Sequence, residues 1–94
     1  MAAEEIAGFL LGSCSSLRQF DVYIFGSTLN GIGEDIDILV VGPSDESLSQ
    51  VKRELQNAGE RLPLHILYME PSEAHYTDFV RREGCIPLAQ LCPK

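Results

Sequence analysis

The chain has 94 residues, the size of one small domain and too few for a second hydrophobic core, so we expect a single domain over residues 1–94. Hydrophobic residues make up 45% and charged residues 22%, which excludes disordered, collagen-like and low-complexity proteins. Seven Lys and Arg against fourteen Asp and Glu give a formal net charge of −7, and the basic residues form no run. This charge argues against a nucleic-acid partner, because counterion release needs several phosphate-facing cations.

The three cysteines, Cys14, Cys85 and Cys92, are widely spaced and form no Cys-x-x-Cys pair, so neither a disulfide framework nor a zinc site is indicated. They are typical of packing or surface thiols in a reducing compartment. The apolar stretch at residues 7–11 follows two glutamates and is far shorter than the ~18 apolar residues of a membrane span. The sequence therefore predicts a cytoplasmic protein without membrane contact.

The first half of the chain is predicted to form one helix and two strands. Apolar residues recur at helical spacing over residues 4–18, which predicts a helix there. Two runs rich in β-branched and aromatic residues, 20–25 and 36–41, predict strands that end at Gly26 and Gly42. The connection between these strands is short, which favours antiparallel pairing.

The second half is predicted to add a helix, a strand and a helix. Ser44 is the expected N-cap of a helix that ends near Gly59, followed by a strand at 62–69 and a helix at 72–83 that stops at Gly84. The helical crossover favours a parallel third strand. The predicted fold class is α/β (α+β): a small mixed sheet of about three strands flanked by helices, in the order α-β-β-α-β-α.

The residues best suited to chemistry lie between the first two strands. Gly26 and Ser27 follow the first strand, and Asp35 and Asp37 stand two residues apart at the start of the second. Side chains at this spacing on a strand project to the same face, so the two carboxylates should converge and bind a divalent cation such as Mg²⁺. Gly26 would let the backbone approach a phosphate, to which the Ser27 hydroxyl and nearby N–H groups could donate. The pattern predicts a metal–phosphate site.

This combination resembles the nucleotidyltransferase superfamily related to DNA polymerase beta. The short chain is similar to the minimal nucleotidyltransferase (MNT) type, small prokaryotic domains often encoded as antitoxins beside HEPN toxins. The resemblance implies that Gly26 and Ser27 hold the phosphates of ATP and that Asp35 and Asp37 bind Mg²⁺ and serve catalysis. It further implies transfer of AMP to a hydroxyl of a partner protein such as a HEPN-type toxin, with release of pyrophosphate.

One position departs from the family pattern. The third carboxylate that the family places on the third strand is replaced by His65. Imidazole binds Mg²⁺ poorly compared with oxygen ligands, so His65 is either a functional replacement in the catalytic set or the sign of a degenerate site. Four glutamates are alternative sources of the missing carboxylate, and no spacing rule selects among them: Glu60, Glu70, Glu73 and Glu83.

A second hypothesis is a catalytically degenerate nucleotidyltransferase fold that acts by binding a partner. Such a protein needs an exposed apolar patch. The candidates lie near the C-terminus: Phe79, Val80, Ile86, Leu88 and Leu91. A homo-oligomer is also compatible with the sequence. The expected partners are thus a nucleoside triphosphate and a protein.

Overall fold

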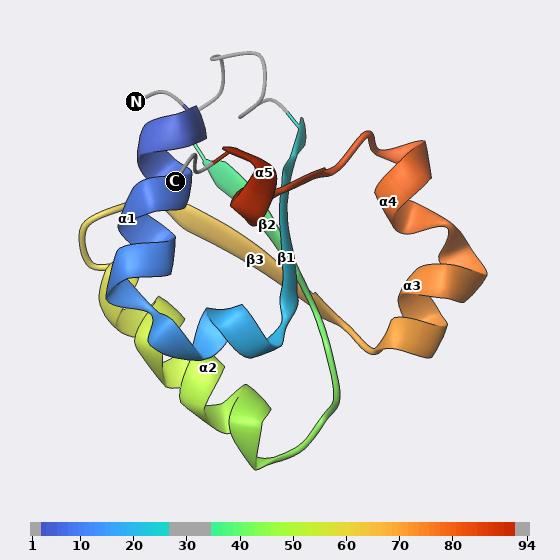
Figure 1. The fold of residues 1–94 in the computed structure, drawn as a ribbon, viewed down its shortest axis with the longest axis horizontal. Coiled ribbons are helices and arrows are strands. Elements are labelled where there is room, and N and C mark those ends of the chain that lie inside the picture. The colour runs from blue at the N-terminus through green and yellow to red at the C-terminus, as the bar shows by residue number, and fades with distance from the viewer. Residues whose placement is uncertain (1–2, 27–34, 92–94) are drawn as a thin grey trace.

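The structure is a computed structural model that describes residues 3–26 and 35–91 (Figure 1). Within these ranges four strands form one sheet in the order β3-β2-β1-β4. The pairing is antiparallel between β1 and β2 and between β1 and β4, and parallel between β2 and β3. The strands are β1 (Asp21–Phe25), β2 (Ile36–Val41), β3 (Leu64–Met69) and β4 (Ile86–Pro87). The mixed sheet predicted from the sequence is confirmed, and β4 is a strand that the prediction lacked.

The sheet has two different faces because side chains alternate along each strand. One face carries buried residues such as Val22, Ile24 and Ile38 and packs against α1 (Ala3–Ser13) and α2 (Glu46–Ala58). Figure 1 shows both helices on one side of the sheet, with α3 (Pro71–Thr77) and α4 (Phe79–Arg82) on the other side. The last helix, α5 (Leu88–Leu91), lies next to α1 and adds Leu88 to the same core. The core between the sheet and α1 and α2 is formed by Ile6, Ala7, Leu10, Cys14, Leu17, Phe20, Val22, Ile24, Ile36, Ile38, Val40, Val51, Leu55, Ala58 and Leu88.

The helix predicted over 4–18 is two elements, not one. Residues 3–13 form α1, and a 3₁₀ helix, η1 (Ser15–Gln19), follows the buried Cys14. Glu54 of α2 accepts hydrogen bonds from the Ser16 backbone N–H at 3.1 Å and the Ser16 hydroxyl at 3.0 Å. Because a serine donates readily to such side-chain acceptors, the Ser-rich segment leaves the α-helix and attaches to α2 instead.

The expected N-cap of the central helix was wrong by one residue. The side chain of Asp45, not of Ser44, caps α2, because its Oδ1 accepts the Ser47 N–H at 2.9 Å. The predicted end is confirmed, since Gly59 donates its N–H to the Leu55 carbonyl at 2.9 Å.

The helix predicted over 72–83 is also divided. Asp78, at φ 55° and ψ 32°, separates α3 (Pro71–Thr77) from α4 (Phe79–Arg82), and its carboxylate accepts from the Arg81 guanidinium at 2.8 Å. An Asp tolerates this left-handed conformation better than most residues. Phe79 of α4 packs edge-on against Phe25 of β1, with ring centroids 5.2 Å apart.

The apolar patch expected near the C-terminus is not formed as predicted. Leu88, in α5 (Leu88–Leu91), is only 1% exposed, and Leu91 packs against the core. The large apolar side chains exposed in the described residues are instead Leu67 and Tyr76. No helix in residues 3–26 or 35–91 has the length and apolar character needed to cross a membrane.

Candidate functional site

Asp37 occupies the middle of the candidate site because β2 lies between two neighbouring strands. Its register partners are Phe25 on β1 and His65 on β3. Alternation along β2 turns Asp37 away from Ile36 and Ile38, which face the helices, so its carboxylate lies on the opposite face of the sheet. The Asp37 side chain is 21% exposed and that of His65 is 74% exposed, so the pair is open to solvent.

Asp37 and His65 are in direct contact. His65 Nδ1 lies 3.1 Å from Asp37 Oδ1. An ionised carboxylate can only accept, so in this hydrogen bond Nδ1–H of His65 is the donor. When the ring is neutral, the lone pair is then on Nε2, on the far side of the imidazole. The contact therefore fixes the tautomer of His65 and leaves Nε2 as the atom able to accept a proton.

Gly26 lies against the second oxygen of Asp37. Its φ is +73°, a conformation that L side chains rarely adopt, and a Cβ placed on it would lie 2.5 Å from Asp37 Oδ2. Glycine is required here for two reasons, the backbone conformation and the space that the carboxylate occupies. The predicted role of Gly26 toward a phosphate remains a prediction, and the structure adds this packing role beside Asp37.

The remaining predicted residues are only partly placed. Asp35 is exposed and directly precedes β2, where the Ile36 N–H donates to the Pro63 carbonyl at 2.9 Å. This bond continues the β2–β3 ladder toward Asp35, two residues from Asp37. Convergence of the two carboxylates on a metal remains a prediction, and Ser27 lies outside the described residues.

No group of three His, Cys, Asp or Glu side chains able to hold a metal occurs within residues 3–26 and 35–91. This fits Mg²⁺, which typically binds through one or two carboxylates and completes its coordination with substrate phosphates and water. Asp35 and Asp37 supply that type of ligand, so a metal that arrives with a nucleotide is compatible with the residues present.

Two of the four alternative glutamates lie far from His65 along β3. Glu70 and Glu73 line a small cavity of about 120 Å³ beyond Met69, at the far end of β3. Glu70 is five positions beyond His65 along the strand, a distance of about 16 Å. Glu60 and Glu83 likewise join no metal-binding group in the described part of the chain. Among these candidates, His65 is the side chain that contacts Asp37.

Sequence reasoning missed the aromatic support of the site. Phe25 pairs with Asp37 in the sheet register, and its contact with Phe79 places α4 beside this end of β1. The strand alternation could have assigned Phe25 to the Asp37 face, but the partner from a helix more than fifty residues later gave no sequence signal.

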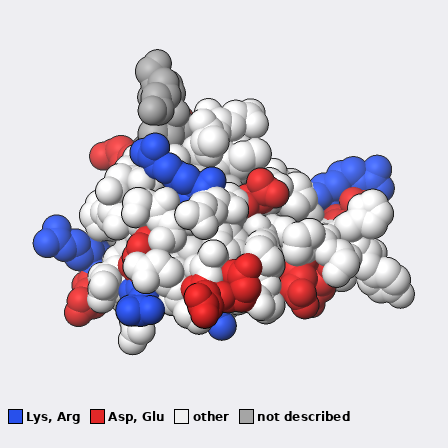
Figure 2. Space-filling view, turned by 60° about the horizontal axis from the view of Figure 1, so that its bottom comes forward, with Lys and Arg blue, Asp and Glu red and all other residues white. Residues whose placement is uncertain are grey.

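The surface charge is mixed. Figure 2 shows separated basic and acidic side chains among uncharged ones, without a continuous basic area on the face that it presents. With a net charge of −7, the chain offers a polyphosphate little general attraction. Nucleotide binding at Asp37 would thus depend on a cation that screens the carboxylates.

One family model matches most of the chain. The family model of the nucleotidyltransferase domain matches residues 10–84, which include β1, β2 and the residues between them as well as His65 on β3. The chain belongs to the nucleotidyltransferase domain family. The four-stranded mixed sheet flanked by helices is consistent with the nucleotidyltransferase fold. Searches of curated proteins and of solved structures gave no significant match.

Proposed function

We propose that this nucleotidyltransferase domain transfers AMP from ATP, with Mg²⁺, to a hydroxyl group of a partner protein such as a HEPN-type toxin in the cytoplasm. We further propose that residues 1–94 act as one minimal, antitoxin-like unit. The observation that supports the transfer most directly is the position of Asp37, with one carboxylate oxygen beside Gly26 and the other 3.1 Å from His65.

In this proposal the two carboxylate oxygens of Asp37 have different roles. Oδ2 lies on the side of Gly26, where the proposal puts the nucleotide phosphates, and Oδ1 orients His65. Bound Mg²⁺ would be held by Asp35 and Asp37 and would offset the negative charge that develops on the phosphate oxygens. In this arrangement His65 serves as the general base that the family's third carboxylate would otherwise provide.

The transfer forms one bond to phosphorus and breaks another. The acceptor hydroxyl oxygen bonds to the α-phosphorus of ATP while the bond from that phosphorus to the bridging oxygen breaks, and pyrophosphate leaves with the electron pair. The hydroxyl proton passes to Nε2 of His65, and the Asp37 carboxylate stabilises the resulting imidazolium. The 74% exposure of the His65 side chain allows a hydroxyl on another protein to reach Nε2.

The second candidate function is partner binding by a catalytically degenerate domain. Its support is the histidine in place of a carboxylate and the exposed Leu67, which lies two residues from His65 on the same face of β3. In this case the Asp37 face would be a contact surface, and nucleotide transfer would be absent.

The first experiment is calorimetric titration of the domain with ATP in the presence and absence of Mg²⁺, beside the Asp35→Asn/Asp37→Asn variant. The proposal expects Mg²⁺-dependent binding that the variant loses while its thermal unfolding midpoint stays close to that of the wild type. A matched control, Asp21→Asn/Glu60→Gln, removes two exposed acidic groups elsewhere and should bind normally.

The second experiment tests the acceptor. A HEPN toxin is incubated with the domain, Mg²⁺ and ATP labelled at the α-phosphate, and the toxin is examined by intact mass spectrometry. A mass gain of one AMP group that His65→Ala abolishes supports the transfer. Toxin binding without any label, by a wild-type domain that also fails to bind ATP, would favour the partner-binding function.

A further inference from the structure

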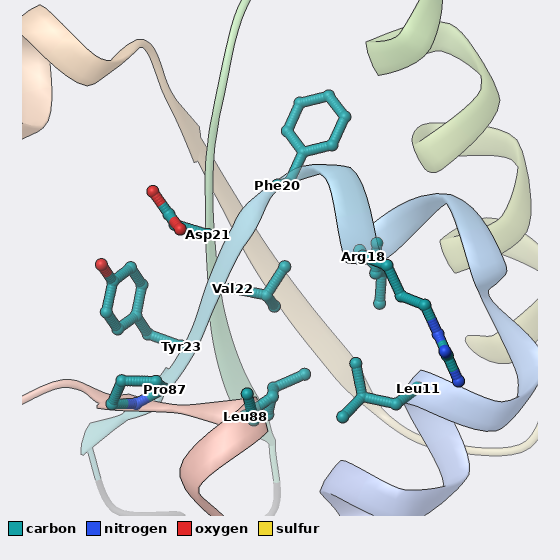
Figure 3. Close-up of a pocket in the computed structure, with 10 residues that line it drawn as sticks. Leu11, Arg18, Phe20, Asp21, Val22, Tyr23, Pro87 and Leu88 are labelled. Atoms are coloured by element: carbon teal, nitrogen blue, oxygen red, sulfur yellow. The ribbon is translucent and has the colours of Figure 1, made fainter.

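A second cavity lies at the opposite end of β1 from Gly26. Its volume is about 440 Å³, within the range of small-molecule pockets, and its lining is mainly apolar (Figure 3). The residues around it begin at the first half of β1 and continue into η1, β4 and α5. It shares none of its lining with Asp37 or His65, so the nucleotidyltransferase site does not account for it.

The cavity exists because β4 is short. Its two residues pair only with Tyr23 and Ile24, and the chain then turns into α5. Within the described residues, Asp21 and Val22 therefore have no strand beside them on this edge of β1. The gap is bordered by α5 on one side and by η1 and the end of α1 on the other, which gives a hollow at the sheet edge.

The inner wall of the cavity is preformed. Leu17, Val22 and Leu88 belong to the hydrophobic core and are at most 6% exposed, so their positions are fixed by packing. Leu11 and Ala89 extend the apolar lining toward the surface. An apolar group that enters the hollow would therefore meet an ordered surface and would require no rearrangement of the core.

The charges around the cavity are arranged asymmetrically. Its charged lining residues are Arg18 and Asp21. Strand alternation directs Asp21 and Tyr23 to the face opposite Val22, and Figure 3 shows their polar ends pointing away from Val22 and Leu11. Arg18 lies on the same side as Leu11 and Val22. It is exposed, and the ion pairs found among the described residues do not include it.

We propose that this cavity is a binding site for a small anionic amphiphile, with an alkyl or aryl group against Val22 and Leu88 and a carboxylate paired with Arg18. A guanidinium matches a carboxylate with two parallel hydrogen bonds, and it is hydrated more weakly than an ammonium group. The apolar wall supplies the burial and Arg18 selects the charge of the head group. A cationic head would be repelled, and a neutral head would lose the ionic hydrogen bonds.

The test compares three ligands with the same eight-carbon tail: octanoate, octan-1-ol and octyltrimethylammonium. Each is titrated into the full chain while amide NMR shifts are followed, with attention to Val22, Leu88 and Ala89. We expect saturable octanoate binding that is about tenfold tighter than binding of the alcohol, because a tenfold difference corresponds to the free energy of one charge-assisted hydrogen bond. The cation should bind more weakly than either.

Two variants and one control complete the design. Arg18→Gln should reduce octanoate affinity to that of octan-1-ol, whereas Arg61→Gln, which removes an exposed arginine elsewhere, should leave it unchanged. Ala89→Phe, at an exposed position, should fill the hollow and weaken all three ligands. Absence of saturable octanoate binding, equal affinity for octanoate and octan-1-ol, or an unaffected Arg18→Gln variant would each overturn the proposal. An apolar peptide that binds regardless of Arg18 would instead identify a protein-docking site.

Discussion

Replacing Gly26 with alanine tests the geometry around Asp37 most directly. The new Cβ would lie 2.5 Å from Asp37 Oδ2 and 3.3 Å from its carboxyl carbon. Ordinary contact requires about 3.5 Å, so the carboxylate must retreat by about 1 Å. Because the other oxygen is 3.1 Å from His65 Nδ1, a shift of that size disrupts the hydrogen bond that orients the imidazole.

The backbone adds a separate cost to stability. An alanine at φ +73° is strained by about 1–2 kcal/mol, part of which is offset by the lower entropy of the unfolded chain. The same cost applies at Gly84, where φ is +63° and nothing beyond the chain neighbours lies within 4 Å of the place that a Cβ would take. Gly84→Ala therefore reproduces the backbone strain without displacing any carboxylate.

The two variants are compared by urea unfolding and by calorimetric titration with Mg²⁺ and ATP. Both should lose about 1 kcal/mol of unfolding free energy from the backbone term. Only Gly26→Ala should lose ATP affinity, by at least about tenfold, because the displaced Asp37 carboxylate would lose about the free energy of one charge-assisted interaction. If Gly26→Ala binds ATP as well as Gly84→Ala does, then the position of the Asp37 carboxylate does not control nucleotide binding and our reasoning about the site is wrong.

Three further predictions concern separate parts of the structure. His65→Asp should lower the thermal unfolding midpoint in the absence of metal, because the new carboxylate repels that of Asp37, and should raise the affinity for Mg²⁺. A Mg²⁺ affinity unchanged in calorimetric titration would contradict a metal site beside residue 65. Glu54→Ala should cost about 1 kcal/mol in urea unfolding through the lost Ser16 hydrogen bonds. Hydrogen bonds, first from Gln50 and then from Ser16, lower the pKa of Glu54 in the folded protein. Its contribution to stability is therefore present above the unfolded pKa near 4.5 and is lost as pH falls, so the unfolding free energy of Glu54→Ala should decline less steeply with acid than that of the wild type. Parallel declines of the two proteins would refute this. Burial raises the pKa of Cys85 to about 11. In a Cys92→Ser background its thiol should therefore react slowly with a thiol-specific label at pH 8 and faster above pH 10. Rapid labelling of Cys85 at pH 8 would contradict its burial in the structure.

The parts of the fold that the sequence predicted well are those set by local patterns. The β-branched runs fixed β2 at its observed bounds and β1 to within one residue, and the periodic apolar positions of α2 identified its buried face. The Gly-Ser and Asp-x-Asp spacing indicated the family, which the match over residues 10–84 confirms. These signals are local because strand alternation and helical periodicity act over a few residues.

The features that sequence reasoning missed depend on contacts between distant residues. The break after α1 depends on Ser16 bonding to Glu54, 38 residues later, and no periodicity encodes such a pair. β4 consists of two residues, too short for any pattern, and exists because Ile86 and Pro87 meet the free edge of β1. The sequence places His65 among the candidate catalytic residues on a parallel third strand, but its direct contact with Asp37 depends on the exact register of β2 and β3, which no local pattern gives.

His65 occupies a strand at the edge of the sheet, and most of its side chain is in solvent. A change of residue there would disturb the packing of the described residues less than a change at Ile38 or Leu55 in the core. Histidine and aspartate codons differ by a single base. The step between a histidine-based and a fully carboxylate-based site is therefore short in evolutionary terms, and a lineage could cross it in either direction without first acquiring compensating mutations in the fold.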